Sequence, residues 1–123
     1  MNKERLQLIS NAFDILQKEI HTNAKEKGFW PELEGLEWNG NDSEYPDALD
    51  KINIGDKIAR CHAELSEAYE AARKEIPEQH EKLHAHTKFS VKLADVIMGV
   101  LDIAEAHGIP IGRVIRARMR AGV

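Results

Sequence analysis

The chain has 123 residues, of which 42% are hydrophobic and 31% charged, so it is long enough for one domain with a modest core. Its formal net charge of −4 argues against a protein that coats nucleic acid through phosphate contacts. The single cysteine, Cys61, excludes an intramolecular disulfide, and no apolar run approaches the roughly 18 residues of a membrane span. We therefore expect one cytoplasmic domain, residues 1–123, that binds neither nucleic acid nor membranes.

The first part of the chain predicts a helix from about Lys3 to Lys25. Its apolar residues recur at steps of three and four, which places them along one helical face: Leu6, Ile9, Phe13, Leu16 and Ile20. His21, on the same helix, is expected to be a hydrogen-bonded surface residue, with a position at the functional site as the alternative. Residues 29–50 are rich in Gly, Pro, Asn and acidic residues, which predicts a long ordered loop. Three aromatic residues are scattered through this loop: Trp30, Trp38 and Tyr45.

A second helix is expected to begin near residues 50–56 and to continue to about Glu75. Its predicted apolar face consists of six residues: Ile58, Cys61, Leu65, Ala68, Tyr69 and Ala72. A polar linker with three histidines follows, at residues 77–87. His80 and His84 are four residues apart, a spacing that would suit a transition metal only if the linker were helical.

The third helix, from about Phe89 to His107, is apolar almost all round, which predicts the central helix of a bundle. Gly108 suits the end of this helix, and Pro110 suits the first turn of a short fourth helix. That last helix carries a cluster of basic residues, which usually forms a solvated face and less often contacts a polyphosphate: Arg113, Arg116, Arg118 and Arg120. The sequence has no strand or repeat pattern and so predicts an all-α bundle of four to five helices.

Glu64 and Glu67 form an E-x-x-E motif on the second helix. Residues three apart are neighbours on one helical face, so the two carboxylates can approach a common ion. Taken alone, the motif is common on helices and most often marks a solvated face. Lys57 and Arg60 fall on the same stripe, beside the apolar face.

The third helix strengthens the case for a site. Its apolar stretch, 91–104, contains only three charged residues, all on one stripe: Lys92, Asp95 and Asp102. Because burying an unpaired charge costs several kcal/mol, Asp95 needs either a basic partner or a metal ion. If the second and third helices pack antiparallel, the glutamate pair can face Asp95. Such an all-oxygen site would suit Mg²⁺ or Mn²⁺ rather than zinc.

These motifs, in this order, resemble the MazG-like family of all-α nucleotide pyrophosphohydrolases, whose pattern is E-x-x-E on one helix and E-x-x-D on the next. Glu64 and Glu67 match the first motif, and Asp95 ends the second. Three further segments are similar to family members: His21-Thr22-Asn23-Ala24 with Lys27-Gly28-Phe29-Trp30, Leu101-Asp102-Ile103-Ala104 through Gly108-Ile109, and Ile115-Arg116-Ala117-Arg118-Met119. The resemblance covers most of the chain.

The resemblance implies hydrolysis of a nucleoside triphosphate, ordinary or modified, to the monophosphate and pyrophosphate, with Mg²⁺ or Mn²⁺ as cofactor. It implies that Glu64, Glu67 and Asp95 are the catalytic residues, which hold the metal and orient the attacking water. Candidate substrate-binding residues are Lys57, Arg60, Lys92, Arg118 and Trp30. For Trp30, we prefer a place in the core of its own loop over stacking on a base. The family also implies a homodimer or homotetramer that completes the bundle.

Two positions depart from the family pattern. Lys92 stands where the first glutamate of E-x-x-D is expected, and Gly122 follows Arg118 and Met119 where the family carries an asparagine. Lys92 could swing outward to a phosphate and leave three carboxylates with one metal. Alternatively, its ammonium stands in the place of the metal, in a catalytically impaired nucleotide-binding or structural homologue. A helical interaction module without nucleotide binding is the third interpretation.

Overall fold

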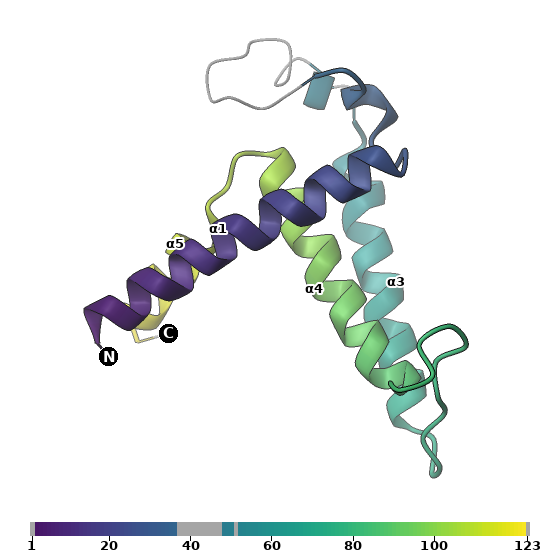
Figure 1. The fold of residues 1–123 in the computed structure, drawn as a ribbon. Coiled ribbons are helices and arrows are strands. Elements are labelled where there is room, and N and C mark those ends of the chain that lie inside the picture. The colour runs from purple at the N-terminus through teal and green to yellow at the C-terminus, as the bar shows by residue number, and fades with distance from the viewer. Residues whose placement is uncertain (1, 37–47, 51, 123) are drawn as a thin grey trace. The chain divides into compact units, whose positions relative to one another are not determined.

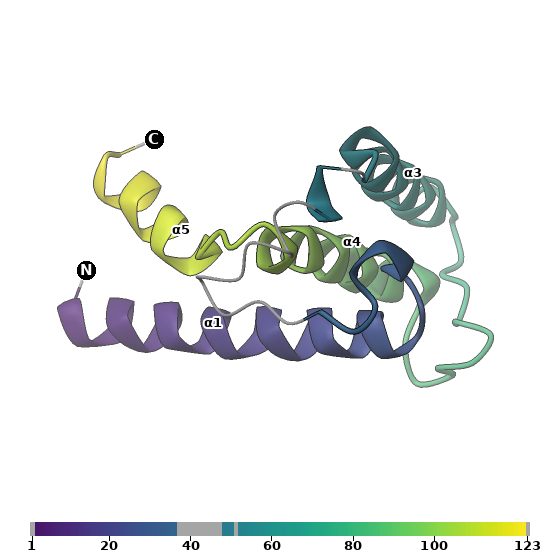
Figure 2. The same ribbon diagram turned by 90° about the horizontal axis from the view of Figure 1, so that it is seen from above.

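The computed structural model describes residues 2–36, 48–50 and 52–122, shown in two views in Figures 1 and 2. Its elements are α1 (Lys3–Glu26), the 3-10 helix η1 (Pro31–Leu33), α3 (Ile54–Ala72), α4 (Lys88–Ala106) and α5 (Ile111–Arg120). Within the described ranges there is no β-strand, only an isolated bridge between Gln79 and Thr87. The all-α class predicted from the sequence is therefore confirmed. Trp38 and Tyr45 lie outside the described residues.

The internal contacts divide the chain into two compact units. Unit 1 consists of Met1–Ile52 and Leu101–Val123, and so contains α1, η1, the last turns of α4, and α5. Unit 2 consists of Asn53–Val100, and so contains α3 and most of α4. Because α4 is one continuous helix, it contributes residues to both units.

In unit 1, α1 and α5 pack antiparallel, and α5 leads back toward the start of α1 (Figure 1). Their closest approach is at Gly112, where an added Cβ would lie 2.8 Å from the Cβ of Phe13 and 3.1 Å from the Cα of Ser10. Glycine at this position therefore allows the two helix backbones to touch. Near the start of α1, the Gln7 side chain accepts a hydrogen bond from Arg116 of α5 at 3.3 Å.

The buried face of α1 differs from the apolar stripe read from the sequence. Its buried residues are Leu6, Ser10, Gln17, His21 and Ala24. By contrast, Ile9 and Leu16 of the predicted stripe are 40% and 46% exposed. Polar residues can occupy the buried face because they have distant partners: Gln17 donates to Glu105 at 2.9 Å and to the carbonyl of Ile109 at 2.8 Å.

Trp30 anchors the start of the predicted loop in the core of unit 1. The buried core cluster consists of Ala24, Trp30, Leu33, Ala48 and Ala106. Trp30 is 2% exposed, and its indole Nε1 donates to both carboxylate oxygens of Asp102 at 2.9 Å. The Nδ1 atom of His21 lies 2.6 Å from Asp102 Oδ1. His21 is 5% exposed, so its expected surface position is wrong, and the reason is this contact with Asp102.

In unit 2, α3 and α4 run antiparallel, as the site prediction required. Glu67 of α3 is paired with Lys92 of α4, and Cys61, between one and two turns earlier in α3, lies against Gly99, about two turns later in α4. A Cβ added at Gly99 would approach Cys61 Sγ to 3.0 Å. This close approach sets the register that brings the charged residues of the two helices together.

The linker between α3 and α4 is not helical, so the condition for a metal site at His80 and His84 is not met. Its ends are joined by hydrogen bonds from the His80 amide to the His86 carbonyl and from the Lys88 amide to the Glu78 carbonyl, both 2.8 Å. His80 Nδ1 accepts from the amides of Lys82 and Leu83, while His84 Nε2 contacts the Glu81 carbonyl. These histidines therefore shape the linker.

Unit 2 leaves most of its apolar surface exposed. In 53–100 the only residue classed as buried is Ala68, whereas Leu65, Tyr69 and Ile97 are 52%, 62% and 56% exposed. The buried residues of α4 are Leu101, Ala104 and Ala106, all near its end. The sequence predicts this helix as the central one of a bundle, and in the single chain only the residues near its end are buried. A pair of helices has no third element of its own to cover the apolar face.

Candidate acidic site

The candidate site lies on the facing sides of α3 and α4 in unit 2. Glu64 and Glu67 are one turn apart on α3, and Lys92 and Asp95 are one turn apart on α4. Lys92 Nζ lies 2.6 Å from Glu67 Oε2, and the two side chains are 30% and 55% exposed. The antiparallel register therefore gathers the residues predicted from the two sequence motifs.

The pKa of Glu64 is raised above its ordinary value of 4.5, and the causes of this rise show which residues surround its carboxylate. Partial burial is the largest cause, followed by repulsion from Asp95, while Glu67 adds a smaller repulsion. Lys92 and Arg60 act in the opposite direction, by attraction. Repulsion among three carboxylates is therefore felt at Glu64 in spite of two nearby cations.

Lys92 is held in its charged form by the same group of acids. Its pKa is raised, chiefly by the hydrogen bond to Glu67, and desolvation opposes that rise. Attraction to Glu67, Asp95 and Glu64 raises it further. The ammonium thus serves as a counter-charge for the carboxylates, although Glu67 is the one carboxylate of the described residues within ion-pair distance of it.

A cleft of about 400 Å³ adjoins the Lys92–Glu67 pair. It is lined by Ser66, Glu67, Glu70, Ala71, Lys74, Glu78, Lys88 and Lys92. Glu78 is contacted by Lys88 at 2.9 Å and by Lys74 at 3.7 Å. The hydrogen bond from Lys88 is the main reason that the pKa of Glu78 is lowered. Sequence reasoning missed Lys74 and Lys88, although the spacing of Lys88 and Lys92 puts both on one face of α4.

The donor set fits a hard divalent cation in chemistry, because three carboxylates supply the oxygen ligands and negative charge that Mg²⁺ and Mn²⁺ prefer. Among the described residues, no three His, Cys, Asp or Glu side chains lie close enough together to hold a metal ion. Glu67 is turned to Lys92 instead. A cation shared by all three carboxylates would therefore have to displace the Lys92 ammonium from Glu67.

The remaining candidates are divided between the units. Arg60 lies on α3 close enough to lower the pKa of Glu64 by attraction, and Lys57 lies one turn before it. Arg118 is an exposed residue of α5, in unit 1. Trp30 is also in unit 1, and at 2% exposure its ring faces are covered, so a stacking role is not retained. The core role that we preferred for Trp30 fits the structure.

Asp102 serves a different purpose from Asp95, although both lie on one stripe of α4. Its carboxylate accepts from Trp30 and contacts His21, which are 72 and 81 residues away in the chain. Sequence reasoning singled out Asp102 as an acid in need of a partner but had no signal for these partners. It is therefore part of the core of unit 1.

No family model, curated protein or solved structure matches this chain. Among the described residues, no helix combines the length and the apolar character needed to cross a bilayer. The function is therefore argued from the residues of the acidic site and from the order of its motifs.

Proposed function

We propose that the protein is a magnesium-dependent nucleoside triphosphate pyrophosphohydrolase of the MazG-like type, which converts a (d)NTP, ordinary or modified, to the (d)NMP and pyrophosphate. The observation that carries this proposal is that Glu64 and Glu67 of α3 lie opposite Lys92 and Asp95 of α4, with Asp95 and Glu67 both close enough to Glu64 to raise its pKa by repulsion. Three carboxylates on two antiparallel helices repel one another, and a divalent cation would offset that repulsion. The E-x-x-E motif followed by a partly matching E-x-x-D motif supports the same proposal.

Each residue of the site has a role that follows from its chemistry. Glu64, Glu67 and Asp95 would hold Mg²⁺ or Mn²⁺, which when bound neutralises phosphate charge and lowers the pKa of a water molecule. Glu67 or Glu64 would also position the attacking water. Lys92 and Arg60 are cations beside these acids and would contact the triphosphate. Lys57 and Arg118 remain further candidates for phosphate binding.

A second candidate function is favoured by the contact between Lys92 and Glu67. The ammonium lies 2.6 Å from one of the three carboxylates and attracts the other two, so it offsets their repulsion without a metal. A protein stabilised in this way would bind a nucleotide, or serve a structural purpose, without hydrolysing the nucleotide. The two functions predict different outcomes for turnover and for the replacement of Lys92.

We further propose that the chain forms a homodimer or homotetramer in the cytoplasm. The half-exposed apolar residues of α3 and α4 support self-association, because contiguous exposed apolar surface on one face marks an interface. Closed two-fold symmetry is the commonest arrangement for such homo-oligomers. The single cysteine is in keeping with a reducing compartment.

The test of the enzymatic proposal is pyrophosphate release from a panel of ordinary and modified (d)NTPs with Mg²⁺ or Mn²⁺. Equal amounts of monophosphate and pyrophosphate are expected, whereas orthophosphate would indicate a different reaction. Glu67→Ala should abolish turnover, and Glu75→Ala, at an exposed carboxylate beyond the end of α3 that does not line the cleft, serves as the control that should retain it. No release from any triphosphate by the wild-type protein would reject the enzymatic proposal and favour the second candidate.

A further inference from the structure

A cleft of about 630 Å³ lies between the start of α1 and the end of α5, entirely within unit 1. It is lined by Lys3, Leu6, Gln7, Arg116, Met119 and Arg120. The three α1 residues and the three α5 residues each have the spacing i, i+3, i+4, so each helix presents one face to the cleft. Its volume is in the range of small-molecule sites, which is about 300–1,000 Å³. None of its residues belongs to the acidic site.

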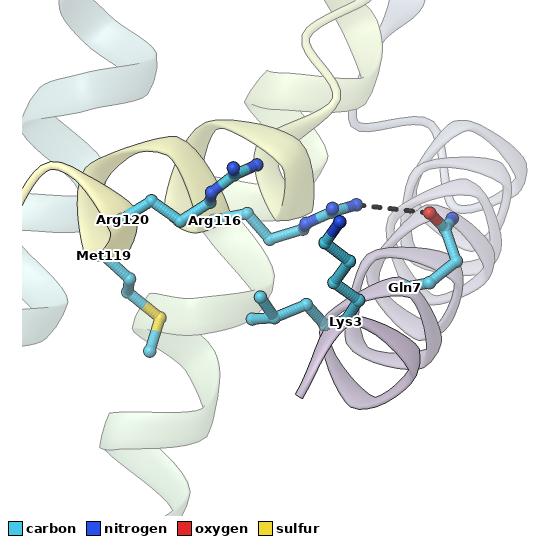
Figure 3. Close-up of a pocket in the computed structure, with 6 residues that line it drawn as sticks. Lys3, Gln7, Arg116, Met119 and Arg120 are labelled. Carbon is cyan, nitrogen blue, oxygen red and sulfur yellow. Dashed lines mark hydrogen bonds between the residues drawn. The ribbon is translucent and has the colours of Figure 1, made fainter. Parts of the chain in front are cut away.

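The cleft is cationic because basic side chains from the two ends of the chain converge on it. Figure 3 shows the guanidinium of Arg116 reaching from α5 toward Gln7, with the ammonium of Lys3 beside it. None of Lys3, Arg116 and Arg120 forms a salt bridge with a carboxylate of the described residues, and like charges brought this close repel one another. From the sequence, we expected the four arginines of α5 to form a solvated face more readily than a polyphosphate contact. Two of the four, Arg116 and Arg120, line this cleft.

One of the cations is held in position. Arg116 is half-buried, and its guanidinium donates to Gln7 Oε1 at 3.3 Å and to the buried Ser10 Oγ at 3.4 Å. These bonds fix the side chain with part of its guanidinium free for another acceptor, because an arginine has five N–H donors. Leu6 and Met119 add apolar surface to the same cleft. The chemistry therefore fits an anion with several oxygens joined to a less polar group.

We propose that this cleft binds the phosphate groups of a small phosphorylated molecule, independently of the metal-dependent site. Lys3, Arg116 and Arg120 would bind the phosphate oxygens by charge-assisted hydrogen bonds, and the planar guanidinium groups suit bidentate contacts. Met119, which is 48% exposed, would contact the remainder of a nucleotide. Inorganic pyrophosphate and a nucleoside diphosphate share the chemistry that the cleft recognises.

Calorimetric titration of the full chain with pyrophosphate, with ADP and with a glutamate-rich peptide tests this proposal. EDTA in every buffer prevents metal-bridged binding at the carboxylates, so the result is separate from the proposed hydrolase function. Lys3→Gln/Arg120→Gln should weaken binding about tenfold by removing two of the three cations. The matched control is Arg5→Gln/Arg113→Gln, which removes equal charge from the same two helices at exposed positions that do not line the cleft.

The proposal is supported if pyrophosphate or ADP binds, if the cleft variant weakens that binding, and if the control variant leaves it within about twofold. The tighter of the two ligands then identifies the source of the phosphate. Equal weakening by both variants would show only general attraction to a basic surface and would overturn the proposal. Absence of binding by both phosphate probes, or binding of the peptide alone, would also overturn it.

Discussion

Lys92 Nζ lies 2.6 Å from Glu67 Oε2, so a cation already occupies part of the space between the acids of α3 and α4. The neighbouring carboxylates, Glu64 and Asp95, are close enough to raise the pKa of this lysine by attraction. Lys92 therefore balances the charge of these acids more than Arg60, the other nearby cation, does. Lys92 is also where the chain departs from the E-x-x-D pattern.

Lys92→Glu should strengthen Mg²⁺ binding at least about tenfold. The substitution removes the ammonium that competes for Glu67 and adds a fourth carboxylate to the site. Calorimetric titration with Mg²⁺ measures the change. Lys88→Glu is the matched control, because it makes the same charge change one turn earlier on α4, where Lys88 pairs with Glu78 instead. Equal affinity in wild type and Lys92→Glu would contradict the idea that Lys92 stands at a cation position.

Glu64 should make the metal-free protein slightly more stable as the pH falls. Its pKa is higher in the folded chain than the ordinary value of 4.5, so the folded state binds this proton more tightly than the unfolded state does. The contribution to the free energy of unfolding grows as the pH falls through the folded pKa and levels off below the unfolded one. Glu64→Gln should remove this dependence and make the protein slightly more stable at pH 7, because it removes the repulsion from Asp95 and Glu67.

Urea unfolding of wild type and Glu64→Gln in EDTA at several pH values measures this effect. Glu75→Gln, at an exposed carboxylate beyond the end of α3, controls for the change in net charge. A Glu64→Gln protein that is less stable than wild type at pH 7 would be incompatible with repulsion at Glu64.

Asp102→Ala should destabilise unit 1 by about 2–4 kcal/mol. The substitution leaves the buried Nε1–H of Trp30 without its acceptor and removes the contact of His21. Asp102→Asn keeps one acceptor oxygen and should cost less. Thermal unfolding measures both variants, with Asp50→Ala as an exposed control. If Asp102→Ala and Asp50→Ala behaved alike, the carboxylate of Asp102 would not be anchoring the loop.

Gly112→Ala should destabilise the pairing of α1 and α5. The new Cβ would lie 2.8 Å from Phe13 Cβ and 3.1 Å from Ser10 Cα, and overpacking of this kind costs about 1–3 kcal/mol. That cost is partly offset by about 1 kcal/mol, because alanine favours a helix more than glycine does. Gly99→Ala meets only the Cys61 side chain, at 3.0 Å, and should cost less. Chemical denaturation compares the two; an equal or smaller loss for Gly112→Ala would argue against backbone contact there.

Leu65→Glu should dissociate the proposed homo-oligomer. Leu65 is 52% exposed on the apolar face of α3, and a charge buried in an apolar interface is costly. Size-exclusion chromatography with light scattering gives the mass of each species. Leu83→Glu, at a 50% exposed leucine in the linker, should retain the wild-type mass. A wild-type protein that is monomeric at all concentrations would reject self-association.

Helix positions could be predicted well because their signals are local. The helix expected from Lys3 to Lys25 is observed as Lys3–Glu26, with Asn2 accepting hydrogen bonds at its start and Gly28 at a φ of 81° just after it. Glu64, Glu67 and Asp95 could be grouped because spacing along a helix fixes which residues share a face. The repulsion of Glu64 by Asp95 and Glu67, which helps to raise the pKa of Glu64, supports that grouping.

What could not be predicted depends on contacts between distant parts of the chain. Nothing near His21 or Gln17 in the sequence indicates that their partners lie on α4 and just beyond it, so His21 was expected at the surface and Gln17 was not singled out. The partner of Lys92 likewise depends on the register of α3 against α4, which is set by the approach of Cys61 to Gly99. The exposure of most of α4 could not be predicted from its sequence either. An apolar helix can be buried inside one chain or at the interface between two chains, and its sequence pattern is the same in both cases.

Mn²⁺ binding to the wild-type protein, followed by the loss of the free-ion EPR signal, tests the central claim most directly. If Glu64, Glu67 and Asp95 share a divalent cation in spite of Lys92, the wild type should bind one Mn²⁺ per chain, and Asp95→Asn should weaken this binding about tenfold or more. Mg²⁺ should compete for the same site. A wild-type protein that leaves Mn²⁺ free, or that binds it equally well with Asp95→Asn, would contradict the claim.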